Sequence, residues 1–308
     1  MARPRLLWYR LGMSPVQHDT SDNLMKGIGL TALGYGMFSV QDATVKWLVD
    51  TYSVPQVLFT RSLVIVLLAS IVGGRGSLAA VARSRNKAAL AVRAALILAA
   101  WLSFYTAARS LSLAQLTTIY FASPIIVVAL SAPILGERVT GLRWAAVLVG
   151  FAGVLLAANP GSGIDPVPAG MALFAAVCWG LGSILVRMII RSETAITQML
   201  VSNTVFAVAC AVALPWVWKN PDGFSLALML GLGVAGGLGQ YFVFEGFRYA
   251  PASIVAPLEY TGLVWAFLYG YLIWADVPHV NVFAGAILIV ASSLGLIWVE
   301  GRRALRAV

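Results

Sequence analysis

Four ionisable side chains lie inside long apolar stretches of the sequence, where charges are rare: Asp42, Arg61, Glu245 and Glu259. A charge inside a bilayer is energetically unfavourable, so such residues usually face a cavity or pair with one another. A carboxylate in this setting can bind the ammonium or another cationic group of a passing solute. It can equally form a structural ion pair with a neighbouring base, and the sequence leaves both roles open.

The structural role has specific candidates. Lys46 is four residues from Asp42, and Arg248 is three residues from Glu245, so each pair shares one helix face. Asp42 and Arg61 are expected at similar depths in adjacent helices. An Asp42–Arg61 ion pair is therefore a further expectation.

Glu259 is the carboxylate most expected to act on a solute. Pro257 stands two residues before it, and a proline frees a backbone carbonyl within a helix. Freed polar backbone in a membrane tends to line a water-filled cavity. A positive partner such as Arg248 would keep Glu259 ionised, whereas without one burial would favour the protonated acid.

Aromatic residues within the apolar stretches form a second group, several of them spaced i, i+4 beside polar residues. An apolar pocket with a few hydroxyl handles is the usual form of a small-molecule site. The alternative is ordinary packing between helices. The complete set of expected substrate-binding residues is Phe38, Trp101, Tyr105, Tyr120, Trp179, Ser183, Tyr241, Phe244, Glu259 and Tyr260.

The elements that must position these residues follow from composition. The chain is 60% apolar and only 11% charged, with a mean hydropathy of +0.87, whereas soluble domains carry about 25% charged residues. Its solvent is therefore mostly lipid. Apolar runs of about 20 residues predict membrane-spanning helices. They occur at 26–46, 53–73, 88–107, 112–135, 142–158, 168–188, 194–217, 225–249, 252–274 and 280–299.

The basic residues predict the orientation of these helices. Seventeen of the 21 lysines and arginines fall on one side if both termini lie on the same side. Cytoplasmic loops carry such an excess, so both termini are expected to be cytoplasmic. This distribution also explains the net charge of +9, so a nucleic-acid partner is not needed to account for it. No recognisable nucleic-acid-binding motif is present.

The chain also repeats itself. A shift of 139 positions places 109–137 on 248–276, and a shift of 141 places Phe38 on Trp179 and Lys46 on Arg187. Each half would hold five helices, an odd number, so the second half would enter the membrane inverted. Inverted repeats recur in secondary transporters, with the substrate site near the midplane between the halves.

One continuous stretch carries a family resemblance. It runs from Ala107-Ala-Arg-Ser-Leu-Ser-Leu-Ala-Gln through Pro124 and Gly136-Glu137-Arg138 to Trp144-Ala-Ala-Val-Leu-Val-Gly-Phe-Ala-Gly153. This stretch resembles the EamA-type branch of the drug/metabolite transporter superfamily, although Arg109 departs from the usual small or apolar residue. The second half keeps a degraded copy, with Asp276 in place of the glutamate and no proline that matches Pro124.

The resemblance, which spans 26–299, implies an all-α membrane protein. Its ten transmembrane helices would form two inverted five-helix repeats around a central cavity. The expected parts are a cytoplasmic tail (1–25), a first repeat (26–158), a periplasmic linker (159–167), a second repeat (168–299) and a cytoplasmic tail (300–308). The resemblance further implies an inner-membrane exporter of small metabolites, most like exporters of aromatic and other neutral amino acids.

The mechanism and the substrate stay open at this point. A facilitator working by alternating access is expected, and the alternative is a proton-coupled exporter of drugs, nucleosides or vitamins. An intramembrane enzyme is not expected, because the two histidines lie outside the apolar runs and no hydrolase or phosphate-binding motif is present. We expect no cofactor and no metal. The expected partners are a small-molecule substrate and the lipid bilayer, with the chain a monomer or weak homodimer.

Overall fold

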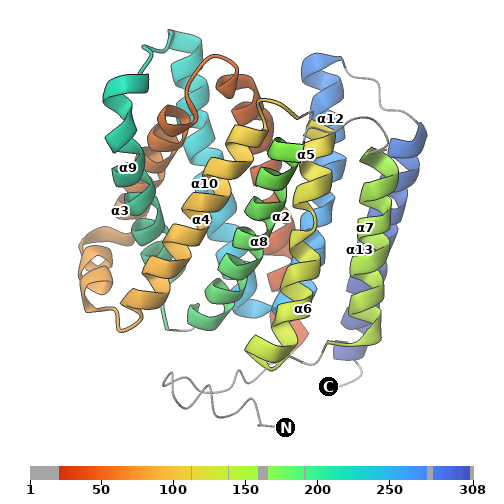
Figure 1. Cartoon of the computed structure of the whole chain (residues 1–308). Coiled ribbons are helices and arrows are strands. Elements are labelled where there is room, and N and C mark those ends of the chain that lie inside the picture. Colours follow the sequence, from red (N-terminus) through yellow and green to blue (C-terminus); the bar gives the residue numbers. More distant parts are fainter. Residues whose placement is uncertain are drawn as a thin grey trace.

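The computed structural model describes residues 21–111, 113–137, 139–158, 166–190, 192–275 and 280–305, which form a bundle of helices without a β-strand among them (Figure 1). The elements are α2 (Ser21–Val49), α3 (Val54–Arg83), α4 (Lys87–Ala107), α5 (Leu113–Tyr120), α6 (Ser123–Leu135), α7 (Gly141–Ala158), α8 (Pro166–Ile189), α9 (Ala195–Val217), α10 (Gly223–Tyr249), α11 (Ala252–Val255), the 3-10 helix η1 (Ala256–Tyr260), α12 (Thr261–Trp274) and α13 (Val280–Leu305).

The prediction of an all-α membrane protein is confirmed. Within the described ranges, five helical stretches are long and apolar enough to cross a membrane: Val54–Gly74, Lys87–Ala107, Pro166–Ile189, Ala195–Val217 and Gly223–Tyr249. Large apolar side chains also lie on the outside of the bundle, as lipid contact requires, with Val72 and Leu272 both more than 60% exposed. The count of ten spans remains a prediction.

Two predicted spans are not continuous helices. The span 112–135 is divided into α5 and α6 at Phe121 and Ala122, and 252–274 is divided into α11, η1 and α12. A proline stands in the first turn of α6 and of η1, where its missing N–H is tolerated. Interrupted helices of this kind form the substrate sites of many transporters.

The helix predicted to end at residue 73 also continues further. α3 reaches Arg83, with a sharp change of direction at Gly74. Gly74 has φ +59° and ψ −167°, a conformation open only to a residue without Cβ. The membrane-spanning part of α3 therefore ends at Gly74, and the following turns run in another direction.

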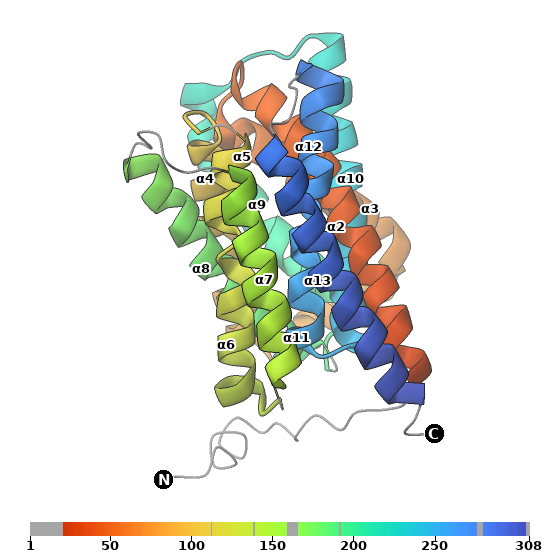
Figure 2. The same cartoon turned by 90° about the vertical axis from the view of Figure 1, so that its right-hand side faces the viewer.

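The packing of the helices follows the internal repeat. α2 packs on α10 and α4 packs on α8, while α3 packs on α9 and α7 on α13. Shifting the first half onto the second converts α2 into α8 and α4 into α10, so the first two contacts are equivalent. α2 and α8 run in opposite directions through the bundle, and the first turn of α2 and the last turn of α13 lie at the same end (Figure 2). On this packing we propose 26–158 and 168–299 as the two repeats.

Glycines let α2 and α10 approach until their backbones touch. A Cβ on Gly246 would lie 2.0 Å from the Thr31 hydroxyl, and one on Gly34 would lie 2.7 Å from Val243. The Thr31 hydroxyl cannot easily turn aside, because it donates a hydrogen bond to the carbonyl of Gly27 at 2.8 Å. We call this contact the α2–α10 seam.

Gly246→Leu is expected to lower the thermal stability of the protein, because its side chain must push α10 away from α2. Overpacking a tight contact costs about 1–3 kcal/mol, and occasionally more. Gly231→Leu is the matched control on the same helix, since a Cβ there meets nothing within 4 Å. Melting of both variants in detergent checks the prediction, and equal melting temperatures would contradict it.

Candidate functional site

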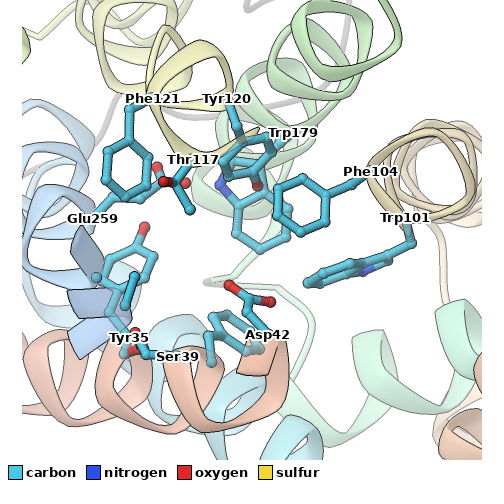
Figure 3. Close-up of a pocket in the computed structure, with 13 residues that line it drawn as sticks. Tyr35, Ser39, Asp42, Trp101, Phe104, Thr117, Tyr120, Phe121, Trp179 and Glu259 are labelled. Atoms are coloured by element: carbon cyan, nitrogen blue, oxygen red, sulfur yellow. The ribbon is translucent and has the colours of Figure 1, made fainter. Parts of the chain in front are cut away.

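A cavity lies in the middle of the bundle between α2, α4, α5, α8, η1 and α12 (Figure 3). It holds about 590 Å³ of space between atoms, its opening included. Its lining residues are Tyr35, Phe38, Ser39, Asp42, Trp101, Phe104, Thr117, Tyr120, Phe121, Trp179, Glu259, Gly262 and Ala266. Both interrupted helices contribute to it, through the end of α5 and through η1.

Most of the wall is aromatic. Trp101 lies with its ring centroid 5.7 Å from that of Trp179 and 6.1 Å from that of Phe38, all edge to face. Phe104 and Tyr120 are 4.9 Å apart in the same manner. Because the rings are so close to one another, a ligand must be thin or the walls must part to admit it.

Two carboxylates reach into the space between these rings, Asp42 from α2 and Glu259 from η1 (Figure 3). Glu259 is only 4% exposed, and its polar neighbours are the Ser123 hydroxyl and the Trp179 indole N–H. One carboxylate oxygen of Asp42 is buried without a hydrogen-bond partner. Within the described residues neither carboxylate forms an ion pair, so the cavity holds two acidic groups available to a ligand.

Arg61 does not form the expected ion pair with Asp42. Its Nε donates a hydrogen bond to the Gln41 side-chain oxygen at 2.8 Å, and its guanidinium lies 4.9 Å from the centre of the Trp101 ring. Gly236 leaves the room for this, since a Cβ there would lie 2.4 Å from Gln41. Gln41 is also a polar neighbour of the Asp42 carboxylate, so it stands between Arg61 and Asp42, which interact electrostatically without a direct ion pair.

Glu245 takes the structural role that the sequence left open. Its carboxylate lies 3.2 Å from Nε of Arg248, one turn further along α10, and both side chains are partly exposed. Arg248 is thereby paired with Glu245 and not with Glu259. Neither residue lines the cavity.

The structure brings together five of the ten residues expected to bind substrate, which line the cavity: Phe38, Trp101, Tyr120, Trp179 and Glu259. The other five lie elsewhere. Tyr105 is buried behind Trp101, with ring centroids 5.3 Å apart, and Tyr260 packs on Phe121 at 5.6 Å. Phe244 lies under the guanidinium of Arg93.

The remaining two expected residues are Ser183, buried one turn from Trp179 on α8, and Tyr241, which is 36% exposed on α10. Sequence reasoning also missed several lining residues, including Tyr35, Ser39, Phe104, Thr117 and Phe121. A signal for two of them was present. Tyr35, Phe38, Ser39 and Asp42 recur at spacings of three and four, which places them on one face of α2.

Two basic side chains, one buried and one partly buried, bind backbone carbonyls toward the two ends of the bundle. Arg187, on α8, lies 3.5 Å from the Glu137 carboxylate and donates to the carbonyl of Phe247. Glu137 also accepts the backbone N–H of Ala252 at 2.9 Å. This set, the Glu137–Arg187 clasp, joins the end of α6 in the first half to α8, α10 and α11 in the second.

Lys46 makes the corresponding contact at the other end. Its ammonium donates to the carbonyls of Ala108 at 3.1 Å and Leu111 at 3.4 Å. The shift of 141 positions places Lys46 on Arg187, and the shift of 139 that applies to the later part of each half places Ala108 on Phe247. The two basic residues therefore bind equivalent backbone carbonyls. Asp276, the counterpart of Glu137, lies outside the described residues.

Several known proteins are similar to this chain. It is 31% identical over 281 residues to the pseudopaline exporter of Pseudomonas aeruginosa, covering 89% of this chain and 97% of that one. It is 30% identical over 215 residues to a riboflavin transporter of Rhizobium johnstonii, covering 69% of this chain and 70% of that one. Over 184 residues it is 27% identical to an S-adenosylmethionine uptake transporter of Rickettsia felis, covering 60% of this chain and 63% of that one.

The fold is also known from a crystal structure, which matches with a TM-score of 0.71 at 19% identity over 92% of this chain and 99% of that one. The model of the EamA-like transporter family matches the sequence twice, over residues 25–159 and 168–298. The chain is thus a multi-pass membrane protein and a small-molecule transporter of the drug/metabolite transporter superfamily, and it belongs to the EamA-like transporter family.

Proposed function

We propose that this protein exports small organic metabolites across a bacterial inner membrane by alternating access through the central cavity. The observation that carries the proposal is the cavity itself, an aromatic chamber lined in part by both interrupted helices, with two carboxylates that form no ion pair among the described residues. Most of the lining is apolar, and a few polar groups remain to orient a ligand, as in small-molecule sites generally.

Aromatic and other neutral amino acids are the first substrate candidates. Their rings suit walls built from Trp101, Trp179 and Phe104, and their ammonium suits Asp42 or Glu259. The names of the relatives support a second group of substrates, since one takes up S-adenosylmethionine and another transports riboflavin. Drugs, nucleosides and vitamins therefore stay in the proposal as the alternative.

Energy coupling has two forms to distinguish. A facilitator lets the substrate run down its own gradient, and a proton-coupled exporter exchanges protons for substrate at an acidic residue. Within the described residues Asp42 and Glu259 form no ion pair. A carboxylate without an ion pair can exchange a proton, so proton-coupled export stays in the proposal as the alternative. A facilitator would ignore an imposed pH gradient, whereas an exchanger would be driven by it.

Proteoliposomes containing the purified protein are expected to move labelled aromatic amino acids or another member of a metabolite panel faster than empty liposomes. Measuring the flux with and without a pH gradient separates the two coupling forms. Trp179→Ala should reduce the flux by removing one aromatic wall. Flux equal to that of empty liposomes for every compound would refute the proposal.

We further propose that both termini are cytoplasmic, because of the basic excess on one side of the predicted spans. Their shared side agrees with the positions of the first turn of α2 and the last turn of α13 (Figure 2). A reporter that is active only in the periplasm should be silent when fused after Val308. A strong signal from that fusion would reverse the orientation.

A further inference from the structure

The charges around the cavity are unbalanced. Asp42 and Glu259 are its charged lining residues, and no lysine, arginine or histidine stands among the described residues that line it. An amino acid carries a carboxylate as well as an ammonium. The cavity offers partners for the ammonium and no basic partner for the carboxylate.

The buried basic residues nearby are already engaged. Arg61 is not a lining residue; its Nε binds Gln41, its guanidinium lies over the ring of Trp101, and its charge acts on Asp42 without a direct ion pair. Arg93 donates to the Ser202 hydroxyl at 2.7 Å and lies 4.4 Å from the centre of the Phe244 ring. The Arg187 and Lys46 contacts lie toward the two ends of the bundle. Moving any of these cations into the cavity would break a buried contact.

The aromatic walls add a second preference for positive charge. Trp101, Trp179 and Phe38 surround one region of the cavity edge to face, with centroids 5.7 to 6.1 Å apart. The face of an indole ring attracts a cation, and the attraction is stronger in a site without water. Aromatic rings combined with unpaired carboxylates are the recognised arrangement for ammonium and related cations.

We propose that the cavity prefers organic cations to zwitterions, so an aromatic amine binds better than the amino acid from which it derives. The ammonium, or a comparable cationic group, lies between Asp42 and Glu259, and the apolar part lies against Trp101 and Trp179. This inference rests on the proposed transport function and names the substrate class of the same site.

The test is a matched series of phenyl compounds: phenethylamine, phenylalaninamide, phenylalanine and 3-phenylpropionate. They share one ring and differ in charge, and none obscures tryptophan fluorescence. Binding to the purified full-length protein in nanodiscs is measured by tryptophan fluorescence and by calorimetry. The two amines are expected to bind at least tenfold more tightly than phenylalanine, and 3-phenylpropionate is expected not to bind. Phenylalanine or 3-phenylpropionate binding as tightly as phenethylamine would overturn the inference.

Variants show whether the preference arises in the cavity. Asp42→Asn and, separately, Glu259→Gln should reduce phenethylamine affinity at least tenfold while changing phenylalanine affinity less. Unchanged amine binding in both folded variants would also overturn the inference. Flux assays separate the two proposals. Flux of neutral or anionic compounds without flux of amines defeats this inference alone, and the lack of any flux defeats the transport proposal as well.

Discussion

Glu259→Gln is expected to reduce substrate transport by about tenfold to a hundredfold while the protein remains folded. Glutamine keeps the size and hydrogen-bonding shape of the side chain and removes the negative charge. A hydrogen bond to a charged group contributes about 1.5–3 kcal/mol, and about 1.4 kcal/mol corresponds to a factor of ten. Glu259 has no ion-pair partner among the described residues, so no structural charge pair is broken by the change.

The measurement is flux in proteoliposomes across a range of pH values, together with melting in detergent. Asp50→Asn is the matched control, because Asp50 is exposed in the turn after α2 and lies outside the cavity. We expect Asp50→Asn to transport like the wild type. If Glu259→Gln also transports like the wild type at every pH, Glu259 is a structural residue. The substrate site would then consist of the aromatic residues alone.

Arg187→Met is expected to produce the largest loss of stability among single substitutions at charged residues. Both side chains of the Glu137–Arg187 clasp are almost fully buried, with exposed fractions of 2% and 3%. Removing one partner of a buried pair leaves the other charge uncompensated, and this costs about 3–5 kcal/mol. The Phe247 carbonyl also loses its donor.

A double variant separates charge from packing. Adding Glu137→Gln to Arg187→Met removes the buried charge that has lost its Arg187 partner, so the double variant should melt at a higher temperature than Arg187→Met alone. Arg83→Met, at the exposed end of α3, controls for the loss of an arginine elsewhere. A double variant that melts lower than both single variants would mean that the clasp acts through packing and not through charge.

Hydropathy was sufficient to locate the helices because each membrane span needs a long apolar run, and the ten predicted runs all fall on described helices. It could not reveal the interruptions at Phe121 and η1. Pro124 and Pro257 were visible in the sequence, but a proline can kink a helix, begin one or be tolerated within one. Pro133 and Pro215 stand inside α6 and α9 without dividing them. Tertiary packing decides among these outcomes.

The partners of the charged residues were harder to predict, because depth along a helix does not fix its rotation. Asp42 and Arg61 were placed at similar depths, yet Arg61 binds the neighbouring Gln41. Tyr241 is as central in its span as Trp101, but it lies partly exposed on the outside of α10. Short-range spacing was more informative, since it groups Tyr35, Phe38, Ser39 and Asp42 on the cavity face of α2.

The close packing of the α2–α10 seam indicates which helices are expected to stay together when the cavity opens. Gly246 lies against Thr31 and Gly34 lies against Val243, so we expect the two helices to move together as one body. Its counterpart is the α4–α8 pair, where Gly182 lies against Ile97. Each body takes one helix from each half of the sequence, and the plane of separation therefore crosses both repeats. We expect opening along that plane to draw Phe38 and Asp42 on one body away from Trp101 and Trp179 on the other, which would separate the walls of the aromatic chamber.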